Sequence, residues 1–176
     1  MQSPEPTIIG GTLPATVVIE HLIISCDHNY FGHHGRPAGS SPIMEVGEIE
    51  CVSGRGIRGD RFFDYRPDYK GQITFFAMEV FEKICAELNL TGIPATAVRR
   101  NVFTRGLELN TLIGREFTVQ GVRFFGAEEC RPCYWMEQAI APGTEARLRG
   151  VGGLRARIRT DGHIRLGPAD LRIEAA

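Results

Sequence analysis

Apolar and β-branched residues gather in several short segments of the chain, and each of these segments has the pattern of a β-strand. The segment "TVVIEHLIIS" (residues 16–25) is mostly apolar and predicts a buried strand. Residues 44–52 predict one or two short strands with charged side chains on one face, and residues 71–76 predict another strand. Residues 170–174 predict a last strand near the end of the sequence.

Two longer segments have the pattern of two strands joined by a tight turn. Residues 115–126 predict two strands around Gln120-Gly121. In residues 154–167, apolar residues alternate with arginines ahead of Asp161-Gly162, a dipeptide typical of two-residue turns. Each of the two segments therefore predicts a β-hairpin.

One segment has a clear helical period. Its apolar residues recur at spacings of three and four and form a single stripe, made of Ala77, Val80, Phe81, Ile84, Cys85 and Leu88. Gly92 and Pro94 end this predicted helix. Many short strands with few helices predict a mainly β fold, either a β-barrel or a compact β-rich domain.

The segment "CDHNYFGHHGRPAGSSP" (residues 26–42) is rich in Gly, Pro, Asn and Ser and predicts a long loop. It carries Asp27 and three histidines, His28, His33 and His34. Histidine clusters can bind zinc, but this spacing is not one that zinc sites use. We interpret the segment as a mobile polar loop, with a loop that contacts substrate as the alternative.

Length and composition restrict the class of protein. At 176 residues, with 43% hydrophobic residues, the chain predicts a tail at residues 1–15 and a single domain at residues 16–176. The net charge of -1 gives no electrostatic reason to expect nucleic acid or a membrane surface as a partner. No apolar run approaches the ~20 residues of a membrane span, and the first residues lack the basic region of a signal peptide. We therefore expect a cytoplasmic protein.

Arginine dominates the basic residues, since only Lys70 and Lys83 among the 20 are lysine. In "RRNVFTRG" (residues 99–106), Arg99, Arg100 and Asn101 could bind an anion, although a solvated face explains the segment equally well.

The segment "GRGIRG" (residues 54–59) has the glycine spacing of a dinucleotide-binding loop. The residues that follow it contain Pro67 and lack a helical stripe, so we reject that interpretation. The glycines instead predict a turn that brings Arg58, Asp60 and Arg61 to one place.

Two cysteines, Cys130 and Cys133, lie three residues apart in "EECRPCYWMEQ" (residues 128–138). A zinc site would need a second pair at ligand spacing, and a thioredoxin-like pair would need a βαβ context; the chain predicts neither. Pro132 suits the first turn of a helix, which would also contain Cys133. There the helix dipole and Arg131 would favour thiolate, the form that acts as nucleophile, persulfide carrier or soft-metal ligand.

Taken together and in this order, "GIRGDRFF", "RRNVFTRGLELNTLIGREFTVQGV" and "CRPC" resemble the MOSC family, named for the C-terminal domain of molybdenum cofactor sulfurase. The resemblance covers residues 17–173 and implies a stand-alone member with a closed β-barrel and a few helices. Cys133 matches the cysteine that, in the family, carries sulfur as a persulfide or ligates molybdenum. Cys130 has no fixed family role and is either a resolving thiol or a bystander.

The resemblance also implies a pterin-bound molybdenum cofactor. The cofactor-binding arginine and asparagine of relatives match Arg99 and Asn101, and we expect Arg100 and Arg131 beside them. Three further residues are predicted to line the same cavity, namely Arg58, Asp60 and Arg61. Pyridoxal phosphate, used by larger relatives, is not expected because neither lysine lies in a recognisable Schiff-base site.

Three activities remain open from the sequence. Cys133 acts as a sulfur carrier or molybdenum ligand, the protein reduces N-hydroxylated compounds, or it delivers cofactor or sulfur without turnover. The first and last require a sulfur-donor or recipient protein. The second requires an electron-donor protein, because the chain has no flavin, haem or iron–sulfur motif.

Overall fold

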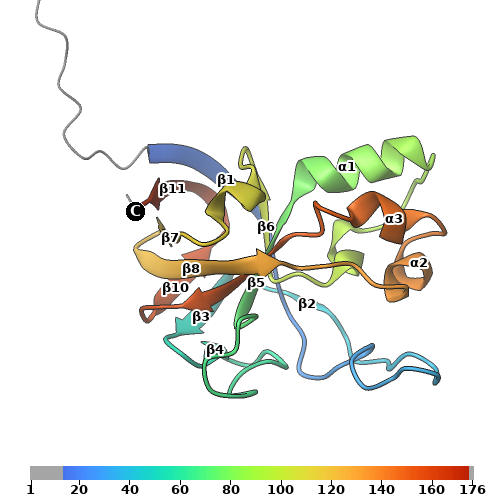
Figure 1. The fold of residues 1–176 in the computed structure, drawn as a ribbon, viewed down its shortest axis with the longest axis horizontal. Coiled ribbons are helices and arrows are strands. Elements are labelled where there is room, and N and C mark those ends of the chain that lie inside the picture. The colour runs from blue at the N-terminus through green and yellow to red at the C-terminus, as the bar shows by residue number, and fades with distance from the viewer. Residues whose placement is uncertain (1–13, 175–176) are drawn as a thin grey trace, which may run out of the picture.

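A closed barrel of seven strands forms one half of the molecule in a computed structural model, which describes residues 14–174 (Figure 1). Around the barrel, each strand is hydrogen-bonded to the next, and the last pairs with the first. The order is β11 (Gly167–Ile173), β7 (Glu116–Val119), β8 (Val122–Glu129), β9 (Leu154–Ile158), β5 (Ile73–Ala77), β6 (Val102–Arg105) and β1 (Pro14–Ile24).

The barrel pairs are antiparallel except for β5 and β6. Parallel neighbours need a crossover connection, and this one contains the helix α1 (Met78–Glu87) and the 3-10 helix η1 (Ala95–Val98). The predicted helix at Ala77–Leu88 is therefore confirmed. The strands predicted at residues 16–25, 44–52, 71–76, 115–126 and 170–174 are confirmed as well.

The second predicted hairpin was wrong, because its two strands do not pair. β10 (Gly162–Arg165) lies in a small sheet beside β3 (Glu48–Val52), which also pairs with β4 (Gly56–Ile57). The turn at Asp161 is held to the end of β3, since its carboxylate accepts a hydrogen bond from the Ser53 backbone N–H at 2.7 Å. This contact directs the chain away from β9.

The remaining helices lie with α1 at one end of the barrel, opposite the C-terminus of the chain (Figure 1). They are α2 (Trp135–Ala139) and α3 (Thr144–Leu148), while the 3-10 helix η2 (Leu109–Leu112) packs against the strands. No helix within residues 14–174 has the length and apolar character needed to cross a membrane. Of the predicted tail at residues 1–15, only the last two residues fall within the described part, in β1.

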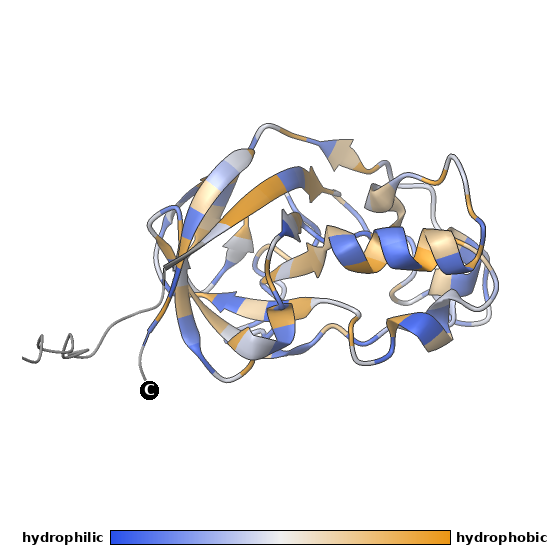
Figure 2. Cartoon of the chain, turned by 90° about the horizontal axis from the view of Figure 1, so that it is seen from above, coloured by the Kyte–Doolittle hydropathy of each residue, from blue (hydrophilic) through white to orange (hydrophobic). Residues whose placement is uncertain are grey.

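Two hydrophobic clusters follow from this arrangement. The first fills the barrel with residues such as Phe75, Phe117 and Phe124, and the second joins the barrel end to the helices through Phe76 and Phe103. Apolar and polar positions alternate in colour along the strands and around α1 (Figure 2). The alternation shows why these segments adopt a two-sided strand or an amphipathic helix.

The segment Cys26–Pro42 contains no helix or strand, as predicted, and a short strand, β2 (Met44–Glu45), follows it beside β1. The loop leaves the barrel at the end of β1 and runs below α2 (Figure 1). It therefore lies at the same end of the barrel as the helices.

Gly126 in β8 is required by a close approach of two backbones. It exchanges hydrogen bonds with Gly114 and Arg115, and a Cβ atom at this position would overlap the carbonyl oxygen of Leu112. We expect Gly126→Ala to lower the free energy of unfolding by about 3 kcal/mol or more, since the backbone cannot move aside easily. Gly47→Ala, whose added methyl meets no atom within 4 Å, is the matched control. Equal denaturation midpoints for the two variants would contradict this packing.

Candidate functional site

A cavity of about 260 Å³ lies where the barrel meets the helices and the Cys26–Pro42 loop. Its walls come from this loop, from residues 61–74, from residues 98–100, from residues 130–136 and from β9. The lining side chains include five arginines and no aspartate or glutamate, and the arginines are Arg61, Arg99, Arg100, Arg131 and Arg155. The cavity wall is therefore strongly basic in a chain whose net charge is -1.

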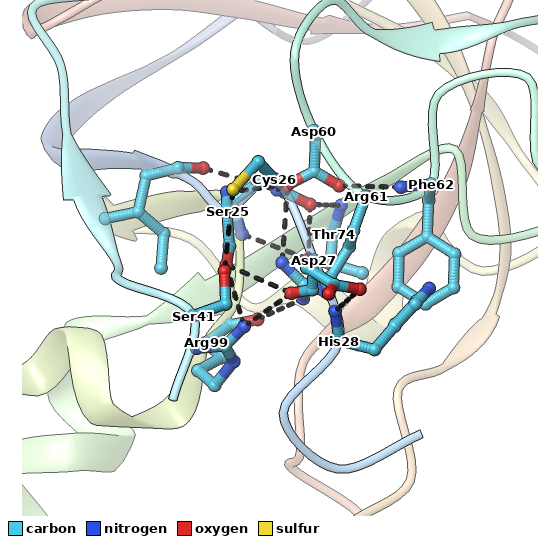
Figure 3. A network of polar contacts seen from close by, with 12 residues as sticks. Ser25, Cys26, Asp27, His28, Ser41, Asp60, Arg61, Phe62, Thr74 and Arg99 are labelled. Atoms are coloured by element: carbon cyan, nitrogen blue, oxygen red, sulfur yellow. Dashed lines mark hydrogen bonds and ion pairs between the residues drawn. The ribbon is translucent and has the colours of Figure 1, made fainter. Parts of the chain in front are cut away.

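Arg99 is the central arginine of this wall. It follows η1 with a left-handed backbone, at φ 55°, and is 6% exposed. Its Nη2 donates to the Ser25 hydroxyl at 2.9 Å and to the Asp27 carbonyl at 3.3 Å, as part of the network in Figure 3. Its Nη1 is buried and has no hydrogen-bond partner among residues 14–174. Burial, with a smaller effect from Arg61, lowers the pKa of Arg99.

Asp60 and Arg61 belong to the same network of polar contacts as Arg99 (Figure 3). The buried Asp60 carboxylate accepts from the Ser25 N–H and from the Arg61 guanidinium, at 3.2 and 3.3 Å. Arg61 also donates to the Arg99 carbonyl at 3.2 Å. Burial is the main cause that lowers the pKa of Arg61, and the Asp60 charge opposes it. Arg61 lines the cavity. Asp60 does not line it, and holds Arg61 in place through their hydrogen bond.

Arg100 lines the cavity, and three of its N–H groups are hydrogen-bonded to backbone carbonyls. It donates to the carbonyls of Val98, Cys130 and Gly152 at 3.0 to 3.2 Å. These contacts fix the chain ahead of Cys133. Three of the five N–H groups of Arg100 therefore hold the wall in position, and its charge adds to that of the cavity.

Asn101 does not line the cavity, contrary to the expectation that it contacts the bound group. Its amide oxygen accepts from the Thr74 N–H and hydroxyl, at 3.1 and 2.8 Å. Its Nδ2 donates to the Ile23 carbonyl and to Asp60, at 3.3 and 3.2 Å. With these four contacts Asn101 connects Thr74, Ile23 and Asp60.

Arg58 also lies outside the cavity, which corrects the prediction that it lines the same space as Arg61. The turn at residues 54–59 is present, but it directs Arg58 to the surface. There its Nε donates to Glu50 at 2.6 Å, and its guanidinium packs over the Phe63 ring at 5.3 Å.

Both cysteines of the pair line the cavity, in different environments. Cys130 is 5% exposed and lies close enough to Arg155 to affect its pKa. Cys133 is exposed, as is Arg131 beside it. The prediction that Cys133 lies in the first turn of a helix was wrong, because α2 begins at Trp135 and Tyr134 is its N-cap. Exposure, not a helix dipole, distinguishes Cys133.

The Cys26–Pro42 loop contributes side chains to the cavity, of which two are histidines. His28 packs edge-on against Phe62 at 4.8 Å, and His34 is hydrogen-bonded to the Tyr134 hydroxyl at 2.9 Å. His33 does not line the cavity and is hydrogen-bonded to the Pro37 carbonyl. Of the two interpretations of this segment, the alternative of a loop that contacts a substrate agrees with the place of His28 and His34 in the cavity wall.

Sequence reasoning missed many of the lining residues, among them Tyr69, Trp135 and Arg155. Arg155 alternates with apolar residues in β9 and was indistinguishable from an ordinary outward-facing residue. Its pKa is raised by Cys130 and Glu128, against an opposing effect of burial. Trp135 lies two positions after Cys133, and this closeness in the sequence was the available signal.

Fold and site together define a β-barrel protein with a basic, aromatic-lined cavity and an exposed thiol at its wall. The sequence model of the MOSC domain matches residues 33–173, so the chain belongs to the MOSC family. The predicted fold class, a closed β-barrel of the MOSC type with a few helices, is confirmed. No curated protein sequence matches the chain significantly.

Solved structures share the fold at low sequence identity. YuaD from Bacillus subtilis superposes with a TM-score of 0.70 at 18% identity, covering 94% of this chain and 100% of that chain. YiiM from Escherichia coli gives a TM-score of 0.62 at 15% identity, covering 90% of this chain and 70% of that chain. YiiM from Geobacillus stearothermophilus gives 0.63 at 15% identity, with 90% and 75% covered.

His28 reports on the charge of the cavity. Burial is the largest cause that lowers its pKa from 6.5, and Arg61 and Arg99 lower it further, against the opposing charges of Asp27 and Asp60. Because the unfolded chain binds this proton more readily, the contribution of His28 to folding stability is lost as pH falls below about 6.5. We expect Arg61→Gln to move the His28 pKa upward in an NMR titration, and Arg58→Gln to leave it unchanged. Equal shifts in both variants would show that His28 does not sense the cavity.

Proposed function

We propose that this cavity binds a pterin-bound molybdenum cofactor and that Cys133 acts on it as a sulfur carrier or as a molybdenum ligand. The observation that supports this proposal most directly is the buried Nη1 of Arg99, a charged donor without a partner among residues 14–174. A buried donor left unsatisfied costs about 1–3 kcal/mol. A cavity wall that retains such a donor is suited to an anionic acceptor, such as the phosphate of the pterin.

The residues present fit such a group in charge and in surface chemistry. Arg99 and Arg61 offer guanidinium groups, which recognise phosphate with paired donors. The aromatic rings of Tyr30, Phe62 and Trp135 give the other walls a surface suited to a planar heterocycle. Arg131 is exposed beside Cys133 and adds positive charge at that side of the cavity.

Cys133 is the thiol in the cavity wall that solvent can reach, and Cys130 is almost completely buried. Exposure allows a donor protein to reach Cys133, which favours a sulfur carrier, and its place in the wall suits a metal ligand. Cys130 is held by the contact of Arg100 with its carbonyl oxygen, and its thiol packs beside Arg155. We therefore assign it a supporting role.

When bound, the cofactor would supply a molybdenum centre capable of two-electron oxygen-atom removal. The alternative function is consequently a reductase of N-hydroxylated compounds, served by an electron-donor protein. In that case the Cys26–Pro42 loop, with His28, Tyr30 and His34 in the wall, would exclude water from the reacting group. A delivery module, which hands cofactor or sulfur to another enzyme, would use the same binding residues without turnover.

Arg99→Gln tests the binding part of the proposal. The change removes the charge of the unpartnered donor, and the loss of one charge-assisted hydrogen bond typically weakens binding by about 10- to 100-fold. We expect the variant, purified from a host that makes molybdopterin, to contain much less molybdenum and pterin than the wild type, by elemental analysis and by fluorescence of the oxidised pterin. Arg58→Gln, which removes an arginine outside the cavity, should retain the wild-type content. Equal contents in the two variants would contradict the proposal.

Thiol labelling tests the assignment of the cysteines. We expect iodoacetamide to alkylate Cys133 well before Cys130, because Cys130 is 5% exposed, with the order read by peptide mass spectrometry. Protein loaded with cofactor should protect Cys133 from the reagent. Cysteines outside the cavity, such as the exposed Cys26, provide the internal control. Faster labelling of Cys130, or no protection of Cys133, would overturn the assignment.

A further inference from the structure

Trp135 is a second buried donor in the cavity wall, and neither the fold nor the anion site accounts for it. The residue is 3% exposed and lines the cavity, and it is the sole tryptophan of the chain. Its indole Nε1 is buried and has no hydrogen-bond partner within residues 14–174. Buried indole N–H groups usually have a hydrogen-bond acceptor. Because residues 14–174 supply none for Trp135, we expect the acceptor to come from a bound ligand.

Neighbouring rings hold the indole in place. Tyr30, from the Cys26–Pro42 loop, stacks on it with ring centres 5.0 Å apart and an interplanar angle of 25°. Tyr134 packs against it at 4.8 Å. Trp135 is also the first residue of α2, two positions after Cys133. A ring fixed by such contacts presents its N–H in one direction, which is what an orienting contact requires.

The chemistry of the donor restricts the ligand group that it can meet. An indole N–H is neutral, donates one hydrogen bond and accepts none. An anionic phosphate is served better by the guanidinium groups of Arg61 and Arg99. A single neutral donor among aromatic side chains suits a carbonyl oxygen or a ring nitrogen at the edge of a planar heterocycle.

We propose that Trp135 is a ligand-binding residue of the cavity, whose indole N–H donates a hydrogen bond to an acceptor on the edge of a bound pterin ring. The inference rests on the proposed function, because it takes a pterin as the occupant. It adds an orienting contact near Cys133 to the anchoring contact at Arg99. The two contacts together would fix both the position and the rotation of the ring.

The binding of two probes separates these contacts. Pterin-6-carboxylate carries both the heterocycle and a negative charge, whereas inorganic phosphate carries charge alone. We expect Trp135→Phe, which keeps an aromatic ring, to weaken the binding of pterin-6-carboxylate by about 3- to 10-fold, the loss of one neutral hydrogen bond. The affinity for phosphate, measured by calorimetry, should not change. Arg99→Gln should weaken the binding of both probes.

Replacement of tryptophan by β-(3-benzothienyl)alanine during expression provides a closer control. The analogue has sulfur in place of the N–H and nearly the same shape, and it enters at position 135 alone because the chain has one tryptophan. We expect it to weaken pterin binding as Trp135→Phe does, with an unchanged melting temperature. This protein keeps the test valid if Trp135→Phe fails to fold.

The outcomes distinguish this inference from the proposed function. If wild-type protein binds pterin-6-carboxylate and the benzothienyl protein binds it equally well, the role of Trp135 is overturned while the cofactor proposal stands. If the benzothienyl protein loses phosphate affinity as well, Trp135 contacts the anion, and its assignment to the pterin ring is wrong. If the wild type binds neither probe, both proposals fail.

Discussion

The buried carboxylate of Asp60 is the contact on which the cavity depends. It accepts hydrogen bonds from the Ser25 backbone, the Asn101 amide, the Arg61 guanidinium and the Phe62 backbone. A carboxylate in the interior is tolerated only when it is fully paired, and these partners come from three separate segments. Asp60 thereby fixes the end of β1, the turn before residue 61 and the segment that presents Arg99. Loss of these hydrogen bonds would leave the Asp60 carboxylate buried and unpaired, and would move the cavity walls.

The cavity beside Asp60 is lined by positive rather than negative charge. Five arginines line the cavity. Two of them pair with carboxylates that are not part of its lining, Arg61 with Asp60 and Arg155 with Glu128. Arg99 and Arg61 are partly desolvated, and this lowers the pKa of both guanidinium groups. A protein accepts such local repulsion at a site where an anion relieves it. The Nη1 of Arg99, which has no hydrogen-bond partner within residues 14–174, agrees with the proposal of an anion at this site.

The individual strands and the helix α1 could be predicted from the sequence, because the period of apolar residues in each depends only on residues close together in the chain. The pairing of β10 with β3 could not, since it depends on a contact between Asp161 and Ser53, 108 residues apart. The residues of the candidate site could likewise be predicted only in part. Resemblance to the MOSC family drew attention to Arg99 and Cys133, which both line the cavity, but adjacency in the sequence wrongly placed Arg58 there. Arg155 and Trp135 entered it only through long-range packing.

The central claim is that one cavity holds a molybdenum-bearing pterin between Arg99 and Cys133. Anomalous diffraction at the molybdenum absorption edge, from crystals of protein purified from a molybdopterin-producing host, tests it most directly. The account predicts one strong anomalous peak inside the cavity, on the side of the Cys133 thiol, with phosphate density at the Arg99 guanidinium. A molybdenum peak outside the cavity, or phosphate density remote from Arg99, would contradict it.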